Sequence, residues 1–246
     1  MKFRDQAMAL RVFIGYDSRE PDAYTVAAHS LWRTSGIRAV KLDEPDLRRS
    51  GLFTRPVVRF SGRLFDVISG VPQSTEFALT RFLVPILSSS GWALFTDCDV
   101  VFMRDVNELL SRADPTKAVM VVQHEHVPSA ETKMVDQVQR RYPRKNWSSV
   151  MLWNLDHPAN KRLTTREVNS WHRDELHLFG WLEDDEIGAL QPEWNWLVGE
   201  QPKPAAPAIA HFTLGGPFLK QWPGAEHDDI WYEAAAAYLR DRMLPP

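Results

Sequence analysis

Two carboxylates stand two residues apart in the segment Asp97-Cys98-Asp99, directly after the apolar run at 92–96. In extended backbone, side chains at positions i and i+2 point to the same side. Two hard oxygen ligands side by side suit a divalent cation such as Mg²⁺ or Mn²⁺. Such a cation keeps open positions for diphosphate oxygens, and its charge neutralises a departing nucleoside diphosphate. The alternative is a polar strand end in solvent, because short acidic triplets arise readily by chance.

A second candidate element is the segment HFTLGGPFLKQW at 211–222. His211 follows a short apolar run, and a neutral imidazole at a strand end can be a third metal ligand. Gly215 and Gly216 allow backbone N–H groups to approach a phosphate closely. Lys220 can add a point charge to a diphosphate. The alternative is a hydrogen-bonded histidine followed by an ordinary Gly-Gly-Pro turn.

Two further segments carry candidate nucleotide contacts. Gly15-Tyr16-Asp17 ends the first apolar run, where Tyr16 can stack on a base and Asp17 can accept from a base or ribose. Asp17 can also cap the helix that follows, and the two roles are compatible. Arg81 precedes the acidic triplet and can reach a phosphate or the metal-bound carboxylates, with a surface arginine as the alternative.

The segment Glu183-Asp184-Asp185-Glu186 is unusually dense in negative charge. A carboxylate from Asp184 or Asp185 can orient an acceptor or stabilise an oxocarbenium-like state. The alternative is a solvated helix start, where acidic side chains are favoured.

Two aromatic segments are candidates for contacts with sugars. Trp194-Asn195-Trp196 can stack on an acceptor sugar and hydrogen-bond to it, although core packing is the favoured interpretation. The segment at 145–149, KNWSS, leads into an apolar run and can supply polar groups to a donor sugar.

Alternating apolar runs and helical patterns must position these residues. Strands are predicted at 11–16, 37–42, 92–96, 118–122 and 149–153, and helices at 19–34, 75–90, 160–171 and 226–243. Such alternation favours an α/β fold with a mostly parallel sheet and helices on its faces. Ligands of these sheets bind beyond the carboxyl ends of the strands. This rule places 15–17, 97–99 and 211–216 at one edge.

Bulk composition excludes several classes of protein. The 246 residues, 44% hydrophobic and 25% charged, suit one globular α/β domain over 1–246. A formal net charge of -3 argues against a general nucleic-acid binder. The single cysteine, Cys98, excludes an intrachain disulfide and favours a reducing compartment. We see no signal peptide or transmembrane span, so we expect a cytoplasmic protein that reaches any lipid-linked acceptor peripherally.

Five sequence pieces follow one another along most of the chain: VFIGYD, STEFALTRFLVP, ALFTDCDVVF, NWSSVMLWN and IAHFTLGGPFLKQW. Together they resemble glycosyltransferase family 8 and its relatives, which have the GT-A fold. In that family they correspond to the first nucleotide-binding strand, an arginine-bearing helix, the Asp-x-Asp strand, an Asn-rich strand and a late His-x-x-Gly-x-x-Lys-Pro-Trp element. The resemblance implies a nucleotide-diphospho-sugar transferase fold with a mostly parallel central sheet flanked by helices.

The resemblance also implies an activity and a ligand set. The donor would be a nucleoside-diphosphate sugar, usually a UDP-hexose, bound with Mn²⁺, and transfer to a carbohydrate hydroxyl would retain the anomeric configuration. By position, Asp97, Asp99 and His211 would hold the metal. Lys220 would contact the diphosphate, and Asp17 would lie near the uracil.

The sequence departs from the family pattern at three places. Lys220 follows the histidine at a wider spacing, and Gln221 stands where proline is usual. Trp147-Ser148-Ser149 replaces Asn-Ala-Gly, which leaves the donor sugar open. The run at 184–186 resembles the family's acidic stretch only loosely, so Asp184 and Asp185 are predicted donor or acceptor contacts without a defined catalytic role.

The sequence therefore predicts a metal-dependent glycosyltransferase, and two alternatives stay open. A sugar-phosphate nucleotidyltransferase would normally carry a Gly-rich basic loop after the first strand, which GYDSREPDAY lacks. A non-catalytic module that binds sugar nucleotides or glycans would keep the same ligands without turnover.

Overall fold

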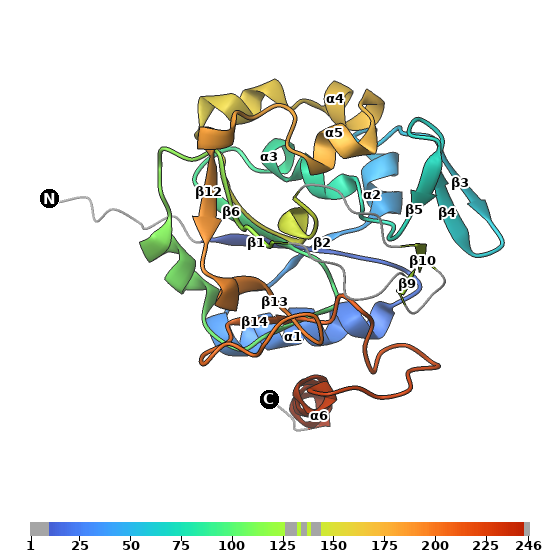
Figure 1. Ribbon diagram of the computed structural model, residues 1–246, viewed down its shortest axis with the longest axis vertical. Coiled ribbons are helices and arrows are strands. Elements are labelled where there is room, and N and C mark those ends of the chain that lie inside the picture. The colour runs from blue at the N-terminus through green and yellow to red at the C-terminus, as the bar shows by residue number, and fades with distance from the viewer. Residues whose placement is uncertain (1–9, 126–131, 134–136, 139–143, 244–246) are drawn as a thin grey trace, which may run out of the picture.

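The computed structural model describes residues 10–125, 132–133, 137–138 and 144–243. Its centre is a six-stranded sheet with the strand order β12-β8-β11-β6-β1-β2 (Figure 1). These strands are β1 (Arg11–Gly15), β2 (Val40–Leu42), β6 (Trp92–Thr96), β8 (Val119–Val122), β11 (Val150–Asn154) and β12 (Ile187–Leu190).

Five of the six strands point the same way, and β11 alone runs against them. β1 pairs in parallel with β2 and β6, and β12 pairs in parallel with β8. β11 lies antiparallel between β6 and β8. All five residues of β11 are buried, as expected for a central strand covered on both faces. The predicted mostly parallel sheet is therefore confirmed.

Smaller sheets surround this centre. One has the order β13-β14-β7, formed by β7 (Val100–Phe102), β13 (Trp196–Leu197) and β14 (Ile209–His211). Another has the order β3-β4-β5, formed by β3 (Val57–Phe60), β4 (Arg63–Asp66) and β5 (Val71–Gln73). A two-stranded sheet joins β9 (Thr132–Lys133) to β10 (Gln137–Val138). The β3–β4 hairpin projects from the body of the molecule (Figure 1).

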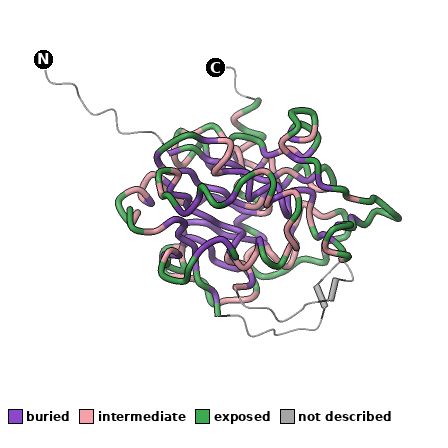
Figure 2. Tube along the Cα trace, turned by 90° about the horizontal axis from the view of Figure 1, so that it is seen from above, coloured by how far each residue is buried: buried purple, intermediate pink, exposed green. Residues whose placement is uncertain are grey.

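Helices cover both faces of the central sheet (Figure 1). On one side lie α1 (Pro21–Ser35) and α6 (Asp228–Met243), and on the other α3 (Val84–Leu87), α4 (Thr165–Ser170) and α5 (Arg173–His177). The remaining helices are α2 (Glu44–Arg49) and the 3₁₀ turns η1 (Thr80–Leu83), η2 (Val106–Arg112), η3 (Trp147–Ser149), η4 (Pro158–Arg162), η5 (Asp184–Glu186) and η6 (Pro192–Asn195). The buried residues gather between these layers (Figure 2).

The first helix follows the sequence signals. Pro21 occupies its first turn, where a missing N–H costs nothing. Gly36 ends it in the left-handed conformation and donates its N–H to the Trp32 carbonyl. The N-cap is Glu20, and no side-chain cap bond forms there, so the interpretation of Asp17 as the cap is wrong.

Two of the predicted helices are interrupted or shortened. The segment 75–90 contains only η1 and α3, because Gln73 Nε2 donates to the carbonyls of Thr75 and Glu76 that a helix would use. Pro85 also has no N–H for a helical bond. The segment 160–171 divides into η4 and α4, because Thr164 and Glu167 form a capping box that starts a new helix.

Candidate active site

Three predicted metal ligands come together at the carboxyl edge of the central sheet. Asp97 and Asp99 lie in the loop that joins β6 to β7. β14 pairs antiparallel with β7 and sets His211 opposite Val100, which brings the imidazole beside Asp99. One ligand atom from each of Asp97, Asp99 and His211 lies within 4.8 Å of the others. The His211 Nε2 atom is 3.3 Å from Asp99 Oδ1.

The Asp97 carboxylate is crowded by other charges. Burial and the neighbouring Asp99 raise its pKa, while Arg81 and His211 lower it, and the balance is a pKa of about 6. Its pKa thus stays raised although Arg81 Nη1 lies 2.8 Å from Asp97 Oδ1. A divalent cation would relieve this crowding, and two carboxylates with an imidazole form a donor set that suits one.

Arg81 is a buried residue and not a surface arginine. Its side chain lies near the rings of Phe77 and Phe95, at 5.3 and 5.1 Å from their centroids. Its Nη1 atom also donates to the Ser148 carbonyl at 2.8 Å. Arg81 therefore joins Asp97 to the start of β11, and it lies against a predicted metal-bound carboxylate.

The three residues predicted to contact the nucleoside, 15–17, are in contact with other residues of the protein. Asp17 is fully buried and accepts hydrogen bonds from Arg19 and from the Glu76 N–H. The Lys41 Nζ atom lies over the Tyr16 ring, 4.0 Å from its centroid. A Cβ on Gly15 would lie 2.4 Å from the Phe77 ring, so this glycine permits close packing. Nucleoside contacts by Gly15, Tyr16 and Asp17 stay predictions.

Glu20, which the sequence did not single out, lies in the electrostatic field of the cluster. Burial raises its pKa to about 8, with further upward contributions from Asp99, Asp17 and Asp97. It follows the first strand by five residues, at the start of α1. A carboxyl group at the start of a helix is common, so the sequence held no distinctive signal for it.

The glycine segment after β14 is placed close to Trp222. Gly215 has φ 111°, and a Cβ there would lie 2.9 Å from both Leu219 and Trp222. A Cβ on Gly216 would meet the Phe218 ring at 2.7 Å. The Lys220 side chain is exposed. Contacts of Gly215, Gly216 and Lys220 with a phosphate stay predictions.

Asp184 and Asp185 lie at the amino end of a parallel strand, opposite in direction to the position of Asp97. They form η5 immediately before β12, whereas Asp97 follows the end of the parallel strand β6. Asp184 is 91% exposed and forms an ion pair with Arg144. The carbonyl of Asp185 accepts from Lys117 Nζ at 2.7 Å. The predicted donor or acceptor contacts of Asp184 and Asp185 stay predictions, and the direction of β12 argues against them.

The two tryptophans around Asn195 belong to the core. Trp194 and Trp196 are 0% and 1% exposed, which confirms core packing over an acceptor platform. Asn195 is also fully buried, and its Oδ1 atom lies 2.9 Å from His211 Nδ1.

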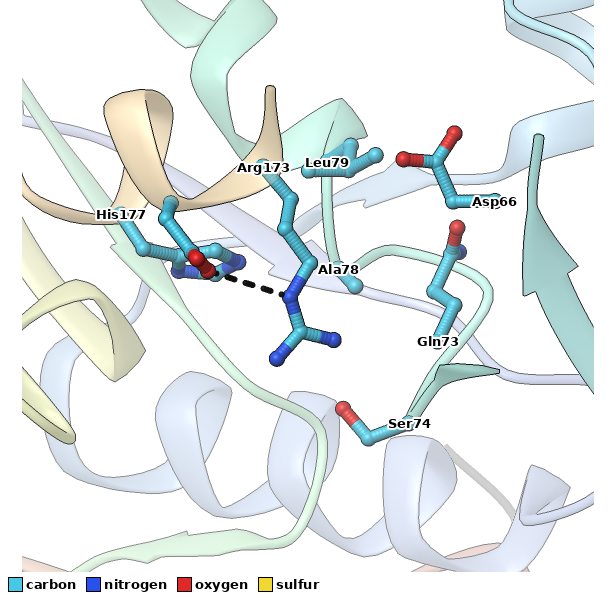
Figure 3. A pocket seen from close by; sticks show the side chains of 8 residues that line it. Asp66, Gln73, Ser74, Ala78, Leu79, Arg173 and His177 are labelled. Carbon is cyan, nitrogen blue, oxygen red and sulfur yellow. Dashed lines mark hydrogen bonds and ion pairs between the residues drawn. The ribbon is translucent and has the colours of Figure 1, made fainter. Parts of the chain in front are cut away.

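A polar pocket lies between α5 and the β3-β4-β5 sheet (Figure 3). Its lining residues are Asp66, Gln73, Ser74, Ala78, Leu79, Arg173, Asp174 and His177. The Arg173 side chain crosses the middle of the pocket, with His177 on one side and Gln73 and Ser74 on the other (Figure 3). Burial, Arg81 and Arg173 hold the pKa of His177 well below its usual range, so this imidazole is neutral.

Hydrogen bonds join the pocket to both the metal cluster and the predicted nucleoside edge. His177 Nδ1 lies 2.8 Å from Ser148 Oγ, and the carbonyl of the same serine accepts from Arg81. On the other side, Arg19 Nη2 donates to the Ser74 carbonyl at 2.6 Å while it pairs with Asp17. The sequence did not reveal this pocket because its lining residues come from two segments about 100 positions apart, 66–79 and 173–177.

Comparison with known proteins gives a clear relative. No family model matches the chain. It is 40% identical over 239 residues to Protein CDI of Arabidopsis thaliana, a match that covers 94% of this chain and 88% of that protein. The chain belongs to the Protein CDI family. In this CDI-family chain, the part that the structure describes has no helix long and apolar enough to cross a membrane.

Solved structures identify the fold of this family member. Glycosyltransferase GlyE of Streptococcus pneumoniae TIGR4 superposes with a TM-score of 0.58 at 14% identity, over 96% of this chain. The chain spans 64% of the GlyE chain, less than two thirds of it. Galactosyltransferase LgtC, solved with donor and acceptor sugar analogs, gives 0.54 at 14% identity, over 93% of this chain and 96% of LgtC. The fold is therefore that of GT-A type glycosyltransferases.

Proposed function

We propose that this protein is a metal-dependent glycosyltransferase that moves a hexose from a nucleoside-diphosphate sugar to a hydroxyl of a carbohydrate acceptor. The observation that carries this proposal is the convergence of Asp97, Asp99 and His211 at the carboxyl edge of a GT-A sheet. Ligands of open α/β sheets bind at that edge. The family resemblance supports UDP as the nucleotide and retention of the anomeric configuration.

The donor set favours Mn²⁺, with Mg²⁺ as the second choice. Carboxylate oxygens suit both ions, and the imidazole nitrogen of His211 favours a transition metal over Mg²⁺. When bound, the cation would neutralise charge on the departing nucleoside diphosphate. Asp97 and Asp99 are assigned to holding the ion, so neither is assigned as a general base. An oxygen of the departing phosphate is proposed to take the proton of the acceptor hydroxyl.

The pocket beside α5 is the proposed place for the sugar of the donor. Its polar groups include an arginine, a carboxylate and a neutral histidine, which together donate to and accept from ring hydroxyls. Its walls are joined to Asp97 through Ser148 and Arg81. A sugar in this pocket would lie beside a diphosphate held at the metal cluster. The proposal includes no nucleic-acid partner.

The test is a panel of UDP-, GDP-, ADP- and dTDP-sugars incubated with the protein and Mn²⁺, scored by release of the nucleoside diphosphate. We expect release from at least one donor, abolished by EDTA and by Asp97→Asn. Thermal shift measurements on the same panel separate catalysis from binding. Stabilisation by a donor without release would favour a binding module instead, and no response to any donor would overturn the proposal.

A further inference from the structure

The carboxamide of Asn195 lies directly behind the imidazole of His211. Asn195 ends η6, which follows β12 at the same sheet edge as the metal cluster. Its Oδ1 atom is 2.9 Å from His211 Nδ1. Its Nδ2 atom donates to Ser149 Oγ at 2.9 Å and to the Asn146 carbonyl at 3.4 Å. Both side chains are almost completely buried, at 0% for Asn195 and 2% for His211.

These partners fix which way the carboxamide points. A backbone carbonyl only accepts hydrogen bonds, so the Asn146 oxygen must face the NH₂ group of Asn195. Ser149 Oγ donates to that same carbonyl at 2.7 Å, which leaves its lone pairs for Asn195 Nδ2. The carboxamide oxygen is therefore the atom that faces His211.

The orientation of the carboxamide determines the protonation pattern of the imidazole. Because Asn195 Oδ1 can only accept, His211 Nδ1 must carry a proton. The remaining ring nitrogen, Nε2, is the one that lies 3.3 Å from Asp99 Oδ1. A neutral imidazole held in this way presents the Nε2 lone pair on the side of the two carboxylates.

We infer that Asn195 is a positioning residue that holds His211 in the tautomer and orientation needed to ligate a divalent cation through Nε2. The inference rests on the metal site of the proposed function, and it replaces an acceptor-sugar contact as the role of Asn195. Ser149 and the Asn146 carbonyl complete the arrangement by holding Asn195. Partners of this kind orient metal-bound histidines in many proteins.

Variants of Asn195 distinguish a role in orienting the His211 imidazole from a role in core packing alone. Asn195→Leu keeps the branched shape of the side chain but removes the acceptor, and loss of such a partner typically costs about 10- to 100-fold in metal affinity. Asn195→Asp keeps an oxygen acceptor for Nδ1–H, so we expect it to recover most of the affinity. Asn160→Leu is a matched control: Asn160 is 5% exposed and donates to the Ala118 and Asn154 carbonyls. It lies away from His211, so its loss should leave metal affinity unchanged.

The first measurement is Mn²⁺ binding to the full chain without any nucleotide sugar, followed by electron paramagnetic resonance of free Mn²⁺. We expect Mn²⁺ affinity to fall from wild type to Asn195→Asp and further to Asn195→Leu. The affinity of Asn160→Leu should equal that of wild type. Equal Mn²⁺ affinity in wild type and Asn195→Leu would overturn the inference. Absence of Mn²⁺ binding in wild type would instead overturn the proposed metal site.

The second measurement is made on the wild-type protein without a bound metal, and a variant serves only to assign a signal. Nitrogen-15 spectra of the wild-type imidazoles report which ring nitrogen carries the proton, and the signal of His211 is assigned by its loss in His211→Gln. We expect a protonated Nδ1 in both the neutral and the cationic ring. A neutral ring with the proton on Nε2 alone would contradict the inference, whatever the outcome of the Mn²⁺ titration.

Discussion

Two segments of this protein are rich in carboxylates, and they have opposite surroundings. Asp97 and Asp99 follow the carboxyl end of β6, whereas Asp184 and Asp185 precede the amino end of the parallel strand β12. The side chain of Asp97 is 14% exposed and that of Asp184 is 91% exposed. The two acidic runs thus differ in exposure and in the end of the strand to which each is attached.

The pKa shifts of Asp97 and Glu20 are opposite in direction to that of Glu186. Burial raises the pKa of Asp97 to about 6 and that of Glu20 to about 8, with neighbouring carboxylates adding to both shifts. In the run 183–186, burial acts in the same direction on Glu186, but hydrogen bonds from the Glu183 N–H and Arg162 outweigh it and lower its pKa. The carboxylates around Asp97 thus raise one another's pKa, whereas the protein compensates the charge of Glu186. Surplus negative charge is what a cation would balance.

The largest expected effect is a loss of turnover when the carboxylates at 97 or 99 are substituted, compared with those at 184 and 185. Asp97→Asn or Asp99→Asn should lower metal-dependent turnover by more than about 100-fold, since removing even an outer-shell partner costs about 10- to 100-fold. The matched double variant Asp184→Asn with Asp185→Asn should retain turnover within about 2-fold of wild type. The measurement is release of nucleoside diphosphate at saturating Mn²⁺. A large loss in the double variant would restore Asp184 and Asp185 as site residues.

A smaller effect is expected at the pocket. Arg173→Gln should lower kcat/KM for the donor by about 10- to 100-fold, because hydrogen bonds to a charged group contribute about 1.5–3 kcal/mol. Arg166→Gln, an exposed arginine on the neighbouring helix α4, is the control and should have no effect. Steady-state kinetics with the donor found in the panel provide the measurement. Equal kinetics in both variants would remove the pocket from the sugar site.

The sequence was sufficient for features that depend on local spacing. The i, i+2 pattern of Asp97 and Asp99 after a buried strand predicted two convergent carboxylates, and the structure places both at the sheet edge. The apolar runs predicted the six central strands except β12, because IGAL is too short a run to stand out. His211 was predicted from an apolar run and a family resemblance.

Features that depend on long-range pairing were not predictable in this way. The position of Asp184 follows from the parallel pairing of β12 with β8, which local pattern does not reveal. Asn195 reaches His211 because β13 pairs with β14, and its fixed orientation depends on Ser149 and Asn146 far earlier in the chain. The predicted helix 75–90 is shortened for a local reason instead, since the Gln73 side chain donates to the carbonyls of Thr75 and Glu76.

Glu20 is expected to affect the pH dependence of the free energy of unfolding, which needs no activity assay. In the metal-free folded protein its pKa is about 8, against an ordinary value of 4.5. As pH rises between these values, the unfolded chain releases a proton that the folded chain keeps, so the free energy of unfolding falls. Glu20→Gln should remove this decline and make the variant more stable than wild type at pH 8, but not at pH 4. Urea unfolding in EDTA measures it, and parallel pH profiles would contradict the account.

The smallest effect is expected for the ion pair of Arg144 with Asp184. The carboxylate is largely exposed, and exposed pairs typically contribute less than about 1 kcal/mol. Asp184→Asn should therefore change the free energy of unfolding by less than about 1 kcal/mol and leave Mn²⁺ affinity unchanged. Denaturant unfolding with and without Mn²⁺ measures both quantities. A change in Mn²⁺ affinity would mean that the two acidic regions are coupled.

The most direct test of the central claim is a Mn²⁺ titration of the full chain, with and without UDP, in wild type and in Asp97→Asn, Asp99→Asn and His211→Gln. We predict one Mn²⁺ site in wild type, tighter affinity when UDP is present, and loss of both properties in each of the three variants. Circular dichroism confirms that the variants remain folded. Wild-type affinity for Mn²⁺ in folded Asp97→Asn and Asp99→Asn would contradict the account.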